Sequence, residues 1–114
     1  MKSQVRDTTI LKKVMESIEH IENFTKDVTC EEFLKNEMLK HAVTMALLNI
    51  GELIHHLSKE FKANTKIPHE KIVGLRNLAA HGYHDLKFES IWGTIKTSIP
   101  ELKTEIKKHL QKST

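Results

Sequence analysis

The sequence predicts an all-α protein, and three observations indicate this class. The 114 residues include only two prolines and four glycines, so few positions interrupt a helix. Aromatic residues make up 5% of the chain, whereas leucine, isoleucine, lysine and glutamate are frequent. Apolar residues also recur at three- and four-residue spacing. The length suits one domain, residues 1–114, so we expect a single up-down bundle of four to five main helices.

The first half of the chain shows two apolar stripes separated by a short helical piece. Asp7 or Thr8 can cap the first helix. Thr29 and Glu32 have the spacing of a capping box for the short piece, and Asn36 can cap a restart. The first stripe consists of Ile10, Leu11, Val14, Ile18 and Ile21. The second consists of Met38, Leu39, Ala42, Val43, Ala46, Leu47, Ile50, Leu53, Ile54 and Leu57. The second stripe is wide, which predicts a central helix packed on more than one side.

A polar connection and a further helix are expected next. Residues 62–67 are polar and predict the connection. The helix then begins near Pro68, because proline suits a first helical turn. It ends at Gly82, because glycine accepts the left-handed conformation after a helix. The apolar positions between these two residues are Ile72, Leu75, Leu78 and Ala79. His84 and Asp85 then begin a loop.

Two more helices complete the expected bundle. The apolar positions of the first are Phe88, Ile91, Trp92 and Ile95, and those of the second are Leu102, Ile106 and Leu110. Pro100 would break a helix interior, so Ser98 with Glu101 is interpreted as a capping box that starts the last helix. We interpret Phe88 and Trp92 as core residues rather than as platforms for RNA bases.

Composition limits the class of protein further. Cys30 is the only cysteine, which excludes an internal disulfide and is typical of a reducing compartment. Residues 1–9 are polar, unlike the apolar centre of a signal peptide. No run approaches the roughly 20 apolar residues that a membrane span requires. We therefore expect a cytoplasmic protein that does not enter the membrane.

The charges are distributed unevenly, although the net charge is only +3. Residues 1–57 contain seven Lys/Arg and nine Asp/Glu, whereas residues 58–114 contain eleven and six. The basic half begins with Lys59, Lys62, Lys66 and Lys71. This asymmetry suits a polyanion such as RNA, with Lys66 and Lys71 as candidate contacts. A solvated lysine-rich surface is the alternative.

The candidate chemistry lies in Arg76-Asn77-Leu78-Ala79-Ala80-His81-Gly82-Tyr83. Arginine keeps its charge and suits an anionic oxygen, whereas histidine titrates near neutral pH and can move a proton. These two groups can cleave a phosphodiester. Arg76 and His81 diverge by roughly 140° on an ideal helix. We therefore expect that the helix relaxes before Gly82 or that a second copy of the chain completes the site. A structural arginine and a helix-terminal histidine are the alternative.

This eight-residue segment, called the octamer below, resembles the R-x-x-x-x-H-x-Y signature of HepT-like proteins. These proteins are small all-α members of the HEPN (higher eukaryotes and prokaryotes nucleotide-binding) group. Further similar segments are Asn49-Ile50-Gly51-Glu52, Ile67-Pro68, Ile72-Val73-Gly74-Leu75-Arg76-Asn77, Ile91-Trp92 and Ile99-Pro100-Glu101-Leu102. The resemblance covers most of the chain. His69 and Glu70 depart from it, because the family usually has tryptophan and often a basic residue there.

The resemblance implies a specific function. HepT proteins resemble metal-independent endoribonucleases and are toxins of toxin–antitoxin modules, in which arginine and histidine act across a homodimer. Their antitoxin, MntA, is a nucleotidyltransferase that adds AMP to the motif tyrosine. By resemblance, Arg76 and His81 are catalytic and Tyr83 is the modified residue. Asn77 is a supporting residue, and Glu52 orients Arg76 or His81 unless it is only a solvated glutamate.

Other functions remain possible at this point. The chain could be a non-catalytic substrate-binding or acceptor subunit of a two-component nucleotidyltransferase, or a degenerate HEPN scaffold that acts only as a dimer. Eight histidines, including His55-His56 and the pair His81 and His84, are candidate ligands for a metal ion. However, Cys30 is isolated and no H-E-x-x-H motif occurs, so we expect neither a metal nor another cofactor.

Overall fold

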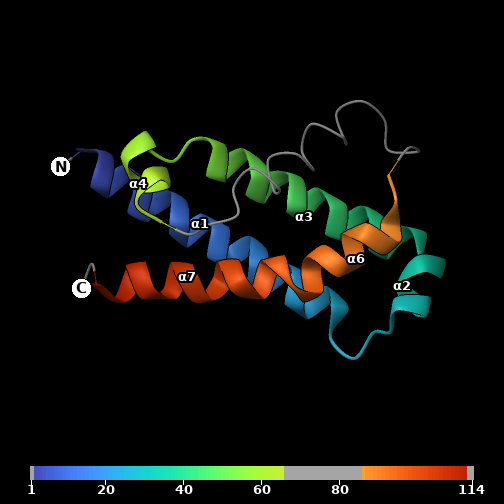
Figure 1. Cartoon of the computed structure of the whole chain (residues 1–114). Coiled ribbons are helices and arrows are strands. Elements are labelled where there is room, and N and C mark those ends of the chain that lie inside the picture. The colour runs from blue at the N-terminus through green and yellow to red at the C-terminus, as the bar shows by residue number, and fades with distance from the viewer. Residues whose placement is uncertain (1, 66–85, 113–114) are drawn as a thin grey trace.

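The computed structural model describes residues 2–65 and 86–112 (Figure 1). Within those residues every element is a helix, which confirms the predicted all-α class. The helices are α1 (Lys2–Thr25), α2 (Cys30–Lys35), α3 (Glu37–His55), α4 (Lys59–Ala63), α6 (Phe88–Lys96) and α7 (Ser98–Lys112). The predicted helix from Pro68 to Gly82 and the loop at His84 and Asp85 lie outside the described residues. None of the described helices has the length and apolarity needed to cross a membrane.

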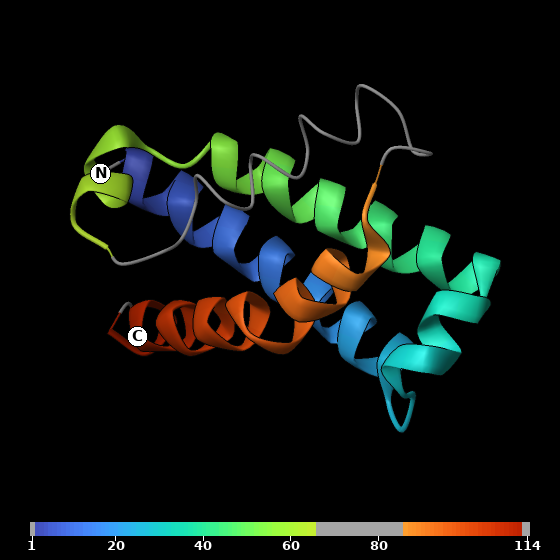
Figure 2. The same ribbon diagram turned by 45° about the vertical axis from the view of Figure 1, so that its right-hand side comes forward.

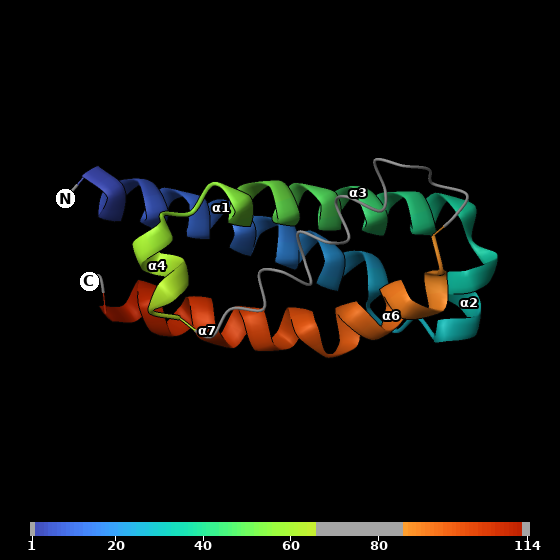
Figure 3. The ribbon, with the colours of Figure 1, turned by 45° about the horizontal axis from the view of Figure 1, so that its top comes forward.

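The long helices α1, α3 and α7 lie side by side and form the body of the bundle (Figure 2). α1 and α3 run in opposite directions and form the largest helix–helix contact, and α7 packs against α1. The short helices α2 and α6 cover one end of the bundle. The other end contains the start of α1, the helix α4 and the end of α7 (Figure 3). We call this second end the terminal end.

The core confirms the predicted apolar stripes. The buried side chains are Ile10, Leu11, Val14, Ile18, Ile21, Phe33, Val43, Leu47, Ile50, Ile54, Leu57, Ile91, Ile95, Ile99, Leu102 and Ile106. All five members of the first predicted stripe are among them. Leu39, Ala46 and Leu53 pack against this core from α3, which confirms its wide apolar face. Among the described helices, however, α1 rather than α3 is central, because α1 packs against both α3 and α7. Met38 is an exception, because its side chain is 82% exposed.

An aromatic cluster closes the end of the core beneath α2. Phe33 is fully buried, and its ring centroid lies 5.1 Å from that of Trp92 and 6.4 Å from that of Phe88. Lys96 and Lys40 cover these two rings from outside, with ammonium-to-centroid distances of 4.6 Å for Trp92 and 4.8 Å for Phe88. The interpretation of Phe88 and Trp92 as core residues is therefore confirmed.

The two caps around α2 are confirmed. Thr29 Oγ1 accepts from the Glu32 backbone N–H at 3.1 Å, and Glu32 Oε1 accepts from the Thr29 backbone N–H at 3.0 Å. The hydrogen bond from the Thr29 backbone holds the pKa of Glu32 below its ordinary value, because it favours the charged carboxylate. Asn36 Oδ1 accepts from Leu39 N–H at 3.0 Å and caps α3.

The predicted start of the first helix is wrong. α1 begins at Lys2, so Asp7 and Thr8 lie inside the helix rather than at its cap. Asp7 is only 6% exposed because it accepts two hydrogen bonds from Ser58, 51 residues away. Thr8 donates its hydroxyl to the Gln4 carbonyl one turn earlier. Both side chains therefore have partners that a cap prediction from local sequence cannot include.

Two other boundaries also need correction. Residues 62 and 63 belong to α4 rather than to a polar connection, because Ser58 Oγ caps this short helix by accepting from Phe61 N–H at 3.0 Å. Ser98 is the first residue of α7 and not the residue before it, so it does not occupy the predicted cap position. Pro100 lies in the first turn of α7, where its missing N–H costs no helical hydrogen bond.

Candidate functional site

Most of the predicted site lies outside the described residues. This holds for Arg76, Asn77, His81 and Tyr83 of the octamer, and also for Lys66 and Lys71. The described residues that adjoin this segment lie toward opposite ends of the bundle, since Thr65 follows α4 and Leu86 precedes α6 (Figure 3). Glu52 is the one predicted site residue that the structure describes.

Glu52 lies near the end of α3 and is about half exposed. Its Oε1 atom lies 3.0 Å from His56 Nε2, one helical turn further on. This contact is an ion pair when His56 is protonated and a hydrogen bond from the imidazole N–H when it is neutral. The ring of His55 lies 5.4 Å from that of His56. The carboxylate is therefore held at the helix end by a titratable neighbour, and its side chain, 48% exposed, remains accessible from solvent.

The contact between Glu52 and His56 was missed by the sequence interpretation. His55 and His56 were considered there only as metal ligands. The available signal was the four-residue spacing between the glutamate and the histidine, which places the two side chains on one face of a helix. Such a contact is common on helix surfaces, so the spacing alone does not identify a site.

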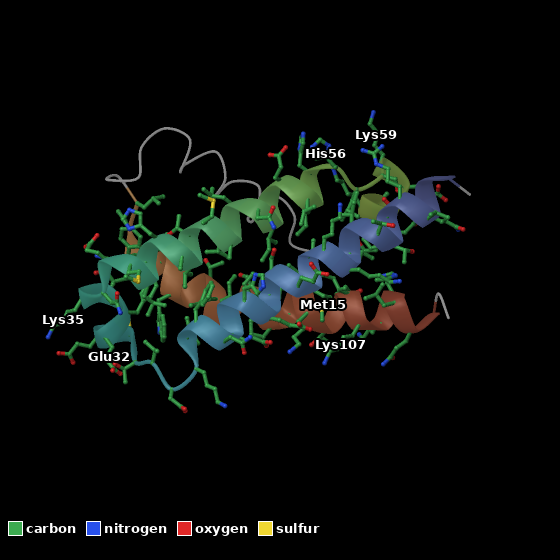
Figure 4. The ribbon with its side chains drawn as sticks, turned by 180° about the vertical axis from the view of Figure 1, so that it is seen from behind. Met15, Glu32, Lys35, His56, Lys59 and Lys107 are labelled. Atoms are coloured by element: carbon green, nitrogen blue, oxygen red, sulfur yellow. The ribbon has the colours of Figure 1, made fainter. Side chains whose placement is uncertain are left out.

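Two lysines that precede the octamer, Lys59 and Lys62, differ in whether their ammonium groups are already hydrogen-bonded within the described residues. Lys62 Nζ donates to the His55 carbonyl at 2.8 Å, so this cation satisfies the C-terminal end of α3. Lys59 is exposed and projects outward near His56 at the α3–α4 turn (Figure 4). Lys59 is therefore better placed than Lys62 to contact a polyanion.

The described part of the chain contains no group of three or more His, Cys, Asp or Glu side chains that could hold a metal ion. Cys30 is half-buried at the start of α2 and is not disulfide-bonded. His81 and His84, which also entered the metal hypothesis, lie outside the described residues.

The fold and sequence together define a small all-α protein with an arginine–histidine motif between α4 and α6 in chain order. The family described as "Ribonuclease HepT-like" matches residues 14–109, which include all of the described helices except the first half of α1 and the last three residues of α7. This match includes the complete octamer. The chain belongs to the HepT-like ribonuclease family, which confirms the resemblance.

Proteins from three organisms are similar to this chain over nearly their full lengths. "Putative RNase MJ1380" of Methanocaldococcus jannaschii is 33% identical over 94 residues, which are 82% of this chain and 86% of the relative. "Putative RNase TTE0752" of Caldanaerobacter subterraneus is 34% identical over 103 residues, covering 90% and 92%. "Probable ribonuclease HepT" of Thermococcus cleftensis is 33% identical over 99 residues, covering 86% and 90%. No solved structure matches the chain.

Proposed function

We propose that this protein is a metal-independent endoribonuclease and the toxin of a toxin–antitoxin module. The observation that carries the proposal is the family match over residues 14–109, because it includes Arg76, His81 and Tyr83 at the spacing of the R-x-x-x-x-H-x-Y motif. The three similar proteins are named as ribonucleases, which supports RNA as the substrate.

The proposed reaction uses the RNA's own 2′-hydroxyl as the nucleophile. His81 acts on its proton as general base, and the 2′-oxygen forms a bond to phosphorus while the bond to the 5′-oxygen breaks. The departing 5′-oxygen takes up a proton, which gives a 2′,3′-cyclic phosphate and a 5′-hydroxyl. Arg76 donates hydrogen bonds to the phosphoryl oxygens, whose negative charge increases in the transition state. No step of this reaction requires a metal ion.

Supporting residues complete the proposed site. Asn77 positions the phosphate or Arg76, and Lys66 and Lys71 attract the RNA backbone without reading its sequence. Glu52 orients Arg76 or His81. The described contact of Glu52 with His56 supports this role, because a carboxylate that is held at the end of α3 can accept from a guanidinium or an imidazole at a defined place. Two chains assemble as a homodimer and bring two histidines to the reaction, so one can act as base and the other as acid.

The reaction is tested by incubating the purified chain with single-stranded RNA in EDTA. We expect cleavage, because the proposed groups are all side chains, and products that end in 2′,3′-cyclic phosphate. These ends are identified by their resistance to phosphatase until acid opens the ring. Cleavage that EDTA abolishes would instead indicate a metal-dependent nuclease. A chain that leaves RNA intact but accepts AMP would be the acceptor subunit of a nucleotidyltransferase.

Regulation is proposed to occur at Tyr83, whose hydroxyl would accept AMP from an MntA-like nucleotidyltransferase. The tyrosine oxygen attacks the α-phosphorus of ATP, and pyrophosphate leaves. The attached phosphate would compete with the RNA phosphate for Arg76 at a high effective concentration. Incubation with the partner, ATP and magnesium should raise the mass in steps of one AMP on Tyr83 and stop RNA cleavage.

Tyr83→Phe is the matched variant for this second test, since it removes only the hydroxyl. It should resist both AMP addition and inhibition. Modification at another residue, or a Tyr83→Phe protein that the partner still silences, would show that Tyr83 is not the regulatory site.

A further inference from the structure

A hollow of about 620 Å³ is lined by residues of the terminal end of the bundle. The first turns of α1 form one side, and α4 and the end of α7 contribute the other. The side chains that matter for its chemistry are Gln4, Thr8, Thr9, Lys12, Phe61 and His109. The volume lies within the range of small-ligand sites, which is about 300–1,000 Å³.

A second hollow of about 210 Å³ adjoins the first and extends it to Asn64 and Thr65. The two share Gln4, Asp7, Phe61 and His109 in their walls. The remaining residues of the second hollow are Ser58, Glu60, Asn64 and Thr65. Thr65 is the residue immediately before Lys66 in the chain. A ligand that fills both hollows would therefore lie along a path from Lys12 to the start of the segment that carries the basic residues and the octamer. We call the two hollows together the terminal groove.

Two rings border both parts of the terminal groove. The centroids of Phe61 and His109 lie 4.9 Å apart, and the ring planes are tilted by 58°. Both side chains are half-buried, and His109 Nε2 lies 3.7 Å from Glu105 Oε1, so a ligand can reach only the solvent-exposed part of the ring pair. Aromatic rings of this kind stack on bases of single-stranded nucleic acids, and they do so with little dependence on the sequence.

The charged side chains of the groove are Lys12 and Asp7 in the larger hollow and Asp7 and Glu60 in the smaller one, so an anion is best accommodated beside Lys12. Lys12 is exposed and makes no ion pair within the described part of the chain. Asp7 is the carboxylate in this wall, but its two oxygens accept from Ser58 N–H at 2.9 Å and from Ser58 Oγ–H at 2.6 Å. An incoming phosphate would therefore meet an available ammonium group, whereas the nearby carboxylate is buried and already hydrogen-bonded.

Hydroxyl groups complete the recognition surface. Thr8 and Thr9 donate their hydroxyl protons to the carbonyls of Gln4 and Val5 at 2.9 and 3.1 Å. Their oxygen lone pairs remain able to accept from a base amino group or a ribose 2′-hydroxyl. A cation, two rings and several hydrogen-bonding groups correspond to the phosphate, base and sugar of a nucleotide.

We propose that the terminal groove binds a single-stranded stretch of the RNA substrate outside the catalytic motif. The proposal rests on the proposed ribonuclease function. Phe61 and His109 contact a base, and Lys12 contacts a backbone phosphate. The continuation of the groove to Thr65 is the reason for assigning an RNA strand rather than a free nucleotide, since a strand can extend from there toward Lys66. The groove then determines how strongly an RNA of sufficient length binds.

The test measures binding of a fluorescent 2′-O-methyl oligocytidylate of about twelve nucleotides, which keeps a base amino group and has a length within the range of single-stranded-nucleic-acid domains. This probe cannot be cleaved by attack of its 2′-oxygen, so binding is separated from the reaction. Phe61→Leu removes the ring but keeps an apolar side chain, and should weaken binding about tenfold, as expected for the loss of one stacking contact. Lys12→Glu should also weaken binding and lower the slope of log Kd against log salt by about 0.7.

Matched controls lie at and just beyond the other end of α1. Lys26→Glu makes the same charge change at an exposed lysine, and Phe24→Leu makes the same ring change at a phenylalanine that stacks on His20. Both controls should bind the probe as the wild type does. Equal losses in Lys12→Glu and Lys26→Glu would indicate general electrostatics and overturn the proposal. Wild-type binding by Lys12→Glu, whose exposed side chain is not needed for folding, would also overturn it.

Different results would contradict the nuclease function and the binding of RNA by the terminal groove. A wild-type chain that binds the probe through Lys12 and Phe61 but does not cut ordinary RNA would contradict the nuclease function and leave the groove as an RNA site. If the chain cuts ordinary RNA in EDTA and both groove variants bind the probe normally, the nuclease function is supported and the assignment of the groove as an RNA site is contradicted.

Discussion

Arg76→Ala and His81→Ala are each expected to lower the rate of RNA cleavage by about 10²–10⁴-fold. A positioned general acid or base contributes this range, and a charge-stabilising donor contributes about 10²–10³. The measurement is the initial rate on single-stranded RNA in EDTA. Both variants should remain folded, so their thermal unfolding temperatures should stay close to that of the wild type. Full cleavage by both variants would assign the activity to another site or to a contaminant.

The same variants test the proposed dimer. If Arg76 of one chain acts with His81 of the other, mixing the two inactive variants restores one complete site in each mixed dimer. Random exchange makes half of the dimers mixed, with one of two sites complete, so about a quarter of the wild-type activity should return. If the His81 side chains of both chains act in one site, a mixture of the two variants stays inactive. In that case, an excess of the His81→Ala chain added to the wild type lowers its activity, because mixed dimers contain only one His81.

The mass of the protein in solution also tests whether the chain forms a dimer. Sedimentation at micromolar concentration should give about twice the mass of one chain. A monomer, or a mixture that neither recovers nor silences activity, would show that each chain contains its own complete site. The divergence of Arg76 and His81 by roughly 140° on an ideal helix would then require a relaxed helix before Gly82.

The features of the fold that could be predicted from sequence are those set by neighbouring residues. The capping box of Thr29 and Glu32 involves residues three apart, and the apolar stripe from Ile10 to Ile21 depends only on helical periodicity. Helix α4 was missed because it has only five residues, and its cap, Ser58, is fixed by a residue in α1. A local pattern contains no information about a partner 51 positions away.

The candidate site was predictable to a different degree. Arg76, His81 and Tyr83 were predicted because their spacing resembles a family signature, and their roles stay predictions because they lie outside the described residues. The groove residues Lys12, Phe61 and His109 have no such spacing. They come from three separate helices, and only the packing of α1, α4 and α7 brings them together. Their assignment therefore required the fold.

Asp7→Ala is expected to lower the free energy of unfolding by about 1.5–3 kcal/mol, the range for hydrogen bonds to a charged group. Asp7 is 6% exposed and joins α1 to the turn before α4 through the backbone N–H and the hydroxyl of Ser58. Removing the carboxylate leaves both donors without this partner in a part-buried place. The measurement is urea unfolding, with Glu19→Ala as the control for an exposed carboxylate on the same helix.

A double-mutant cycle isolates this contact from the capping role of Ser58. Ser58→Ala alone should cost about 1–2 kcal/mol, because it removes the cap of α4 and one hydrogen bond to Asp7. Its backbone N–H can still donate to Asp7 Oδ1. The double variant should therefore lose less stability than the sum of the two single variants, by a coupling energy of about 1–2 kcal/mol. An additive cycle, or an Asp7→Ala protein as stable as Glu19→Ala, would mean that this contact does not hold α4 against α1. Because Phe61 lies on α4 and borders the terminal groove, loss of the contact should also weaken binding of the RNA probe, even at temperatures where the bundle remains folded.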